Sequence, residues 1–206
     1  MAQNENAQIK SRNRVSRFGE VFTAEREVNA MLDLVKEETN RIDSTFLEPS
    51  CGNGNFLVEI LRRKLNTAGK QKYMYHCDKR EEILGDLSLL VVSSIYGIDI
   101  MQDNVDESHA KMLSELCEWY EKETRGLYPL RNGVEGLKPS AELIKAWNYI
   151  LDYNIQRGDF LTMQHPDSHE PIVIRQWNIS GKTVNYTDHN LGDLIHEQEP
   201  KQLLLW

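Results

Sequence analysis

The residues best suited to chemistry form a glycine-rich turn between a short apolar run and a helical pattern. Residues 45–47 read Thr-Phe-Leu, residues 48–55 read Glu-Pro-Ser-Cys-Gly-Asn-Gly-Asn, and apolar residues then recur at helical spacing. Glycines at 52 and 54 let backbone N–H groups approach a ligand closely at a helix start, where an anionic group such as a carboxylate is favoured. The order strand, glycine turn, helix therefore predicts a ligand-binding loop.

Two further apolar runs lead to acidic residues. Residues 95–100 predict a buried strand with Asp99 near its end, and residues 153–155 predict a short strand that leads to Asp159 and Phe160. Ligands of an α/β sheet collect at the carboxyl ends of its strands, where an acid one strand over is placed to accept hydrogen bonds from ribose hydroxyls. The Gly-x-Gly turn alone is a weak signal, but the three strand ends together predict a nucleotide-like binding site.

Amphipathic segments must position these strand ends. A first helix is predicted from Glu25 with Thr23 as its N-cap, and its inward residues are Val28, Met31, Leu32 and Val35. Further helices are predicted over residues 56–65, 81–94, 105–121 and 141–151, the last with Ser140 as its N-cap, and residues 125–139 are predicted to be a loop. The runs 172–179 and 182–186 flank Ser180-Gly181 and predict a β-hairpin.

Strands that alternate with helices indicate an α/β fold, with a mostly parallel sheet flanked by helices and a C-terminal β-hairpin. At 206 residues and 23.9 kDa, the chain has room for one domain and a short appendage. We expect a flexible N-terminal arm over residues 1–19 and a single domain over residues 20–206. Within that domain, residues 20–161 would bind a cofactor and residues 162–206 would form a divergent part with the hairpin.

Composition excludes several classes of protein. With 40% hydrophobic and 27% charged residues the chain is typical of a soluble globular protein, and no apolar run is long enough to span a membrane. The N-terminus lacks the apolar stretch of a secretory signal, so we expect a cytoplasmic protein. Three cysteines without CxxC spacing argue against disulfides and structural zinc. A net charge of -8 argues against a domain that grips nucleic acid by itself.

At these residues the chain resembles the adenine-specific DNA methyltransferases of bacterial restriction-modification systems, in the branch whose S-adenosylmethionine motifs precede the catalytic motif. The resemblance runs through residues 18–32, 46–61, 95–105 and 158–161, and so covers about the first 160 residues. Its most specific segment is residues 46–61, where glutamate, proline, a small residue, cysteine, Gly-x-Gly and phenylalanine follow in order. The resemblance implies a Rossmann-like methyltransferase fold and S-adenosylmethionine as cofactor.

The resemblance also implies a role for each matching residue. Phe22 and Thr23 would line the methionine end of the cofactor, and the cofactor loop would comprise Glu48, Ser50, Gly52 and Gly54. Asp99 would hold the ribose with Ile100 packed on the adenine, while the adenine amine and ring would contact Asp159 and Phe160.

A simpler structural interpretation exists for several of these residues. Phe22 and Phe160 fit core positions, Asp99 fits a helix N-cap, and Asp159 fits a turn. Cys51 reads as a small buried residue rather than a nucleophile.

The family's catalytic motif, Asn or Asp followed by Pro-Pro and an aromatic residue, is missing from this chain. None of the six prolines follows Asn, Asp or another proline. Only 47 residues follow Asp159, too few for the usual strands and the target-recognition region, and from Asp159 onward seven acids face three bases. His165 and His169 flank Asp167, but without further ligands at suitable spacing we predict no metal site.

Three functions remain open on the sequence. The first is a protein that binds S-adenosylmethionine without methylating DNA alone, as a split-enzyme subunit or an accessory protein. It would reach DNA only through a second subunit that carries the catalytic motif. The second is an active methyltransferase in which Asn178 or Asn185 substitutes as acceptor for the target amine. The third is a cofactor-free partner-binding protein of a restriction or anti-phage system, supported by seven acids and two lysines between Asp103 and Glu123.

Overall fold

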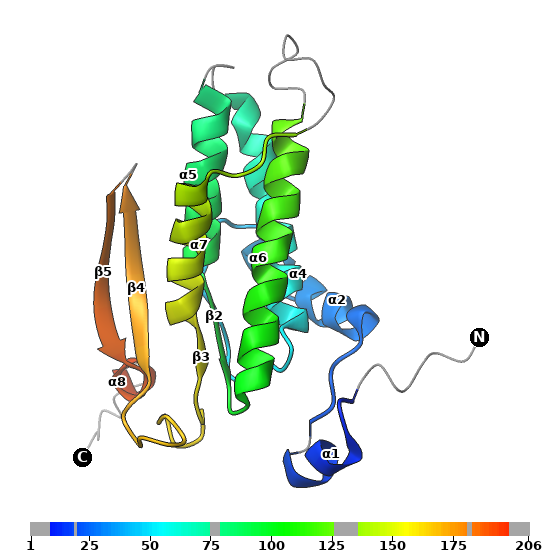
Figure 1. Ribbon diagram of the computed structural model, residues 1–206, viewed down its shortest axis with the longest axis vertical. Coiled ribbons are helices and arrows are strands. Elements are labelled where there is room, and N and C mark those ends of the chain that lie inside the picture. The colour runs from blue at the N-terminus through cyan, green and yellow to red at the C-terminus, as the bar shows by residue number, and fades with distance from the viewer. Residues whose placement is uncertain (1–8, 19, 75–78, 126–135, 181–182, 198–206) are drawn as a thin grey trace, which may run out of the picture.

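A computed structural model describes residues 9–18, 20–74, 79–125, 136–180 and 183–197 of the chain. Its elements, shown in Figure 1, are α1 (Arg12–Phe18), α2 (Glu25–Asp33), α3 (Lys36–Thr39), β1 (Phe46–Glu48), α4 (Asn55–Gln71), the 3-10 turn η2 (Lys72–Met74), α5 (Arg80–Ser93), β2 (Ile95–Asp99), α6 (Gln102–Thr124), α7 (Ala141–Asn154), β3 (Ile155–Arg157), β4 (Val173–Ser180), β5 (Thr183–Asn190) and α8 (Leu191–Glu197). Helices alternate with strands up to β3, so the α/β prediction is confirmed.

The three short strands β1, β2 and β3 form one parallel sheet in that order. In β2 all five residues are buried, whereas β1 lies at an edge of the sheet and exposes Leu47. Because the strands are parallel, their carboxyl ends meet at one edge, below the long helices in Figure 1. The sheet therefore brings the three predicted strand ends together.

The two faces of β2 belong to different hydrophobic clusters. Ile95 packs into the main core, which the helices α4 to α7 build around the fully buried Trp147. The side chains of Tyr96 and Ile98 point to the opposite face and pack on Ile172, Ile174 and Leu191, which belong to the hairpin segment and the start of α8. One layer of helices and one β-hairpin thus enclose the central strand.

The predicted hairpin is confirmed, with Val173–Ser180 paired antiparallel to Thr183–Asn190. It forms a two-stranded sheet of its own and packs beside α5 and α7 (Figure 1). Helices were predicted to flank the sheet, but on this face Ile172 and Ile174, at the start of the hairpin, pack on Tyr96 and Ile98. The two residues that connect its strands lie outside the described residues.

Several local predictions were wrong. Helix α2 begins after Ala24, and no side chain caps it, so Thr23 is not the N-cap. Because α2 ends at Asp33, Val35 lies beyond it and is exposed, as is Met31. Helix α7 continues to Asn154, so β3 begins two residues later than predicted. The predicted cap at Ser140 is confirmed, since its side chain accepts from the Leu143 N–H.

The structure describes only part of the residues on which several other predictions depend. Part of the predicted arm forms α1, and most of the predicted loop at residues 125–139 lies outside the described residues, as does Cys77. Cys51 and Cys117 are free thiols. Among the described residues, no helix is both long and apolar enough to cross a membrane.

Close packing at Gly97 predicts that a larger residue there will destabilise the protein. A Cβ placed there would lie 2.6 Å from Leu57 Cδ1, whereas one at Gly85, in α5, would come no closer than 3.8 Å to Leu143. We expect Gly97→Ala to lower the free energy of unfolding by about 1–3 kcal/mol through overpacking. The matched control Gly85→Ala should raise it by up to about 1 kcal/mol through helix propensity. Urea denaturation measures both, and equal effects of the two substitutions would contradict this packing.

Candidate functional site

The glycine loop after β1 is fixed by backbone hydrogen bonds. The Cys51 N–H donates to the Ile98 carbonyl at 2.9 Å, and the Gly54 N–H donates to the Cys51 carbonyl at 2.9 Å. Gly52 and Gly54 have φ of +53° and +86°, a region that side chains disfavour. A Cβ on Gly54 would also lie 2.8 Å from Ser108 Oγ. The loop conformation and its contact with α6 therefore both require glycine.

Asp99 lies at the carboxyl end of β2 and holds the surrounding segments. Its Oδ2 accepts from the Gly52 N–H at 2.9 Å, and its Oδ1 accepts from the Met101 N–H at 2.8 Å and from Asn104 Nδ2 at 3.1 Å. Its backbone carbonyl accepts from the Gly158 N–H at 2.9 Å. A carboxylate offers about four acceptor sites, so three side-chain bonds leave room for one further donor, such as a ribose hydroxyl.

Phe22 and Thr23 lie against the same loop. The Phe22 ring is buried, and a Cβ on Gly52 would lie 3.2 Å from its Cδ1 atom. The Thr23 carbonyl accepts from Asn55 Nδ2 at 2.9 Å, at the first residue of α4. The segment before α2 is thus joined to the glycine loop.

Glu48 and Ser50 lie on the exposed side of the loop. Glu48 is half-buried, and this burial raises the pKa of its carboxyl group, while Ser50 is exposed. Between them and the glycines, burial and then the charge of Asp99 raise the pKa of the Cys51 thiol to about 12. A protonated, buried thiol is a poor nucleophile, which agrees with the interpretation of Cys51 as a packing residue.

Ile100, Asp159 and Phe160 lie just beyond β2 and β3. The Ile100 side chain is 37% exposed and free to meet a ligand. Asp159 Oδ1 accepts from the Leu161 N–H at 2.9 Å, which closes a turn, and Phe160 packs against the second hydrophobic cluster. The contacts agree with Asp159 as a turn residue and Phe160 as a packing residue. Ile100 is partly exposed.

Sequence reasoning missed a buried amide at this edge. Asn104 lies in the first turn of α6, is 1% exposed, and donates to both Asp99 Oδ1 and Glu20 Oε1. Lys10 and Arg14, from the predicted arm, contact the same turn. The available signal was a polar residue five positions after Asp99, where the helical pattern places an inward side chain.

Other candidate residues lie elsewhere. Asn178 and Asn185 face each other across the hairpin and are exposed, near a tip that points away from the carboxyl edge in Figure 1. His165 Nδ1 lies 2.8 Å from the Arg157 carbonyl, and Asp167 pairs with the Arg157 guanidinium. Within the part of the chain that the structure describes, no group of three or more potential ligands could hold a metal ion.

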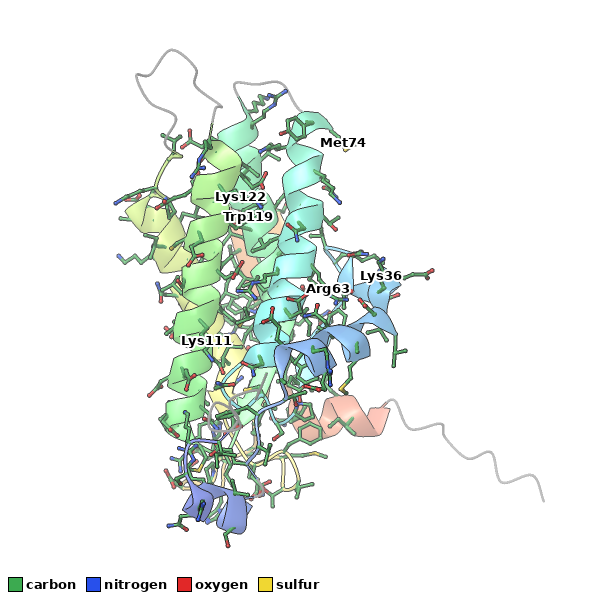
Figure 2. All side chains as sticks on the ribbon, turned by 90° about the vertical axis from the view of Figure 1, so that its right-hand side faces the viewer. Lys36, Arg63, Met74, Lys111, Trp119 and Lys122 are labelled. Carbon is green, nitrogen blue, oxygen red and sulfur yellow. The ribbon has the colours of Figure 1, made fainter. Side chains whose placement is uncertain are left out.

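Two cavities lie along the face formed by α4 and α6, which Figure 2 presents to the viewer. One, of about 350 Å³, is lined by residues of α2, α4 and α6 such as Val28 and Lys111, and another, of about 340 Å³, adjoins Trp119 and Lys122. No predicted cofactor residue lines either of them. The first cavity reaches the glycine-rich turn only at its last residue, Asn55, and the second is lined by no residue of that turn.

No protein-family model, curated protein or solved structure matches this chain. The geometry of the described residues is therefore the only support for the candidate site. That geometry is a glycine loop, a buried carboxylate and an aromatic ring, drawn from three segments to one edge of a parallel sheet.

The environment of Cys51 predicts its reactivity. A thiol with a pKa of about 12 holds roughly 1,000 times less thiolate at pH 8 than one near 9. We expect iodoacetamide to alkylate Cys51 at least that much more slowly in the folded protein than in urea, with a rate that rises about tenfold per pH unit. Mass spectrometry of a variant with Cys77 and Cys117 replaced by serine measures this rate. Rapid alkylation of the folded protein at pH 8 would contradict the buried position.

Proposed function

We propose that this chain is an S-adenosylmethionine-binding subunit with a Rossmann-like methyltransferase fold, related to adenine-specific DNA methyltransferases. It would not methylate DNA alone. The proposal rests on one observation. Gly52 contacts both Phe22 and Asp99 at the carboxyl ends of the strands of a parallel sheet. A glycine loop followed by a helix suits the carboxylate of a cofactor, and a buried acid on the next strand suits its ribose.

The open edge of the sheet supports a split enzyme. In doubly wound sheets a ligand binds where the strand order reverses, with strands on both sides of the crevice. Here the glycine loop follows β1, and among the described residues β1 has a neighbour on one side only. Its exposed Leu47 leaves apolar surface at that edge. A second subunit with the Asn/Asp-Pro-Pro-aromatic motif would add its strand there and complete the site.

Charge supports DNA contact through that partner. The chain carries a net charge of -8, and two of the four cations of the arm, Lys10 and Arg14, are already paired with acids of the chain. Phosphate binding needs cations that are free to replace counterions. DNA would therefore be held by the second subunit.

No specific observation favours either of the two alternative functions, an active methyltransferase or a cofactor-free partner-binding protein. The exposed Asn178 and Asn185 lie away from the carboxyl edge, which leaves a substitute catalytic element without a neighbouring cofactor site. The acids of α6 that suggested a partner surface include Asp103, Glu107 and Glu115, which pair with cations of the chain itself.

Cofactor binding is the first test. We expect S-adenosylhomocysteine to bind the wild type in isothermal titration calorimetry, and Asp99→Asn to weaken binding at least tenfold because it removes the charged ribose acceptor. Ile100→Ala should weaken binding about 5- to 20-fold through lost apolar contact, without disturbing the Asp99 hydrogen bonds. Val173→Ala, at an equally exposed aliphatic residue on β4, is the matched control and should bind as the wild type does.

Circular dichroism will establish that each variant folds. No binding by the folded wild type would refute the proposed function. Equal binding by the wild type and by folded Asp99→Asn would refute the proposed site.

Methyl transfer separates the proposal from an active enzyme. We expect the purified chain to incorporate no radiolabelled methyl groups from S-adenosylmethionine into unmethylated DNA, because the sequence lacks the Asn/Asp-Pro-Pro-aromatic motif. Incorporation that is lost on Asn178→Ala or Asn185→Ala would instead establish the substitute catalytic element.

A further inference from the structure

The N-terminal segment reaches the candidate site through Lys10. Its ammonium lies 3.0 Å from Asp103 Oδ2, 2.8 Å from Asn104 Oδ1 and 2.9 Å from Glu107 Oε2, all in the first two turns of α6. It also lies 5.8 Å from the centre of the Phe22 ring. Phe22 is therefore enclosed between Lys10 and the glycine loop.

Arg14 adds a second attachment, one turn along the segment. Its guanidinium contacts Asp103 Oδ2 at 2.5 Å and Glu20 Oε1 at 2.6 Å. The hydrogen bonds from Arg14 and Lys10 lower the pKa of Asp103 to about 2. Helix α1 is thereby held beside the start of α6, on the side to which the strands' carboxyl ends point (Figure 1).

Asn104 links this attachment to Asp99. Its Nδ2 donates to Glu20 Oε1 at 2.7 Å and to Asp99 Oδ1 at 3.1 Å, while its Oδ1 accepts from Lys10. Both ends of the buried amide are thus used, and its orientation is set by the N-terminal segment. A change at Lys10 or Glu20 would therefore reach the carboxylate that holds the Gly52 N–H.

The glycine loop also contacts the start of α6, and one of these contacts is with Glu107. Asn53 Nδ2 donates to Glu107 Oε1 at 3.1 Å, and Ser108 Oγ donates to the Gly52 carbonyl at 3.0 Å. Glu107 is therefore shared between Lys10 and the loop. One connected set of polar contacts runs from the N-terminal segment to the loop and to Asp99.

We propose that residues 9–18, together with Glu20, form a strap that closes over the candidate cofactor site and positions Asp99 through Asn104. The ligand's identity in this inference rests on the proposed function. The pairs of Lys10 with Asp103 and Glu107 are partly exposed, and each contributes at most about 1 kcal/mol, so this end of the strap can open for ligand entry. Once the strap is closed, it covers Phe22 and slows ligand release. Asn104 is a positioning residue, since it acts through Asp99.

Hydrogen exchange tests the strap without any ligand. The amides of Gly52 and Met101 both donate to Asp99, so their exchange reports on its position. We expect Lys10→Ala/Arg14→Ala to speed exchange at least tenfold in α1 and at both amides. Asn104→Ala should speed exchange at both amides. The control Lys36→Ala/Lys145→Ala removes two exposed cations outside the strap and should change exchange less than twofold.

Unchanged exchange in α1 of the Lys10→Ala/Arg14→Ala variant would overturn the strap. Faster exchange in α1 with unchanged exchange at Gly52 and Met101 would overturn the positioning of Asp99. The same variant, but not the control, should release S-adenosylhomocysteine about tenfold faster in stopped-flow measurements. An equal release rate would overturn the covering role. If the wild type binds no S-adenosylhomocysteine, the proposed function and the covering role both fail, while the exchange data decide the strap separately.

Discussion

The carboxylate of Asp99 is the interaction on which the carboxyl edge of this protein depends. It accepts the Gly52 N–H from the loop after β1 and the Met101 N–H before α6, and the backbone of Asp99 accepts the Gly158 N–H after β3. Three strand ends are therefore held by one residue. Because a buried carboxylate without partners is costly, these contacts also explain how Asp99 remains buried near the surface.

A buried cation joins the chain segments at the other end of the strands, where β1 and β2 begin. The Lys64 ammonium donates to the Ile42 and Ser44 carbonyls ahead of β1 and to Ser94 Oγ ahead of β2, and its burial lowers its pKa to about 8. Polar contacts thus fix both ends of very short strands, while apolar packing on both faces of β2 supplies the bulk of the core. This division suits a sheet whose ladders contain few hydrogen bonds.

The glycine loop, the acid of β2 and the ring of Phe22 are brought together at the carboxyl ends of the strands, and among the described residues β1 has a neighbouring strand on one side only. The hairpin occupies the face of β2 that a helical layer was predicted to cover. The N-terminal strap encloses the same edge from outside, so cofactor access and the geometry of Asp99 would be controlled together.

The sequence by itself determined the alternation of helices and strands, the hairpin, and the positions of Gly52, Gly54 and Asp99, because periodicity and turn chemistry are local properties. Local patterns also misplaced the cap of α2 and extended its apolar register to Val35, which packing did not support. Only the tertiary structure placed the hairpin on β2 and joined Asn104 to Asp99. Those contacts connect segments from distant parts of the chain, and burial, charge pairing and the accommodation of buried polar groups decide them.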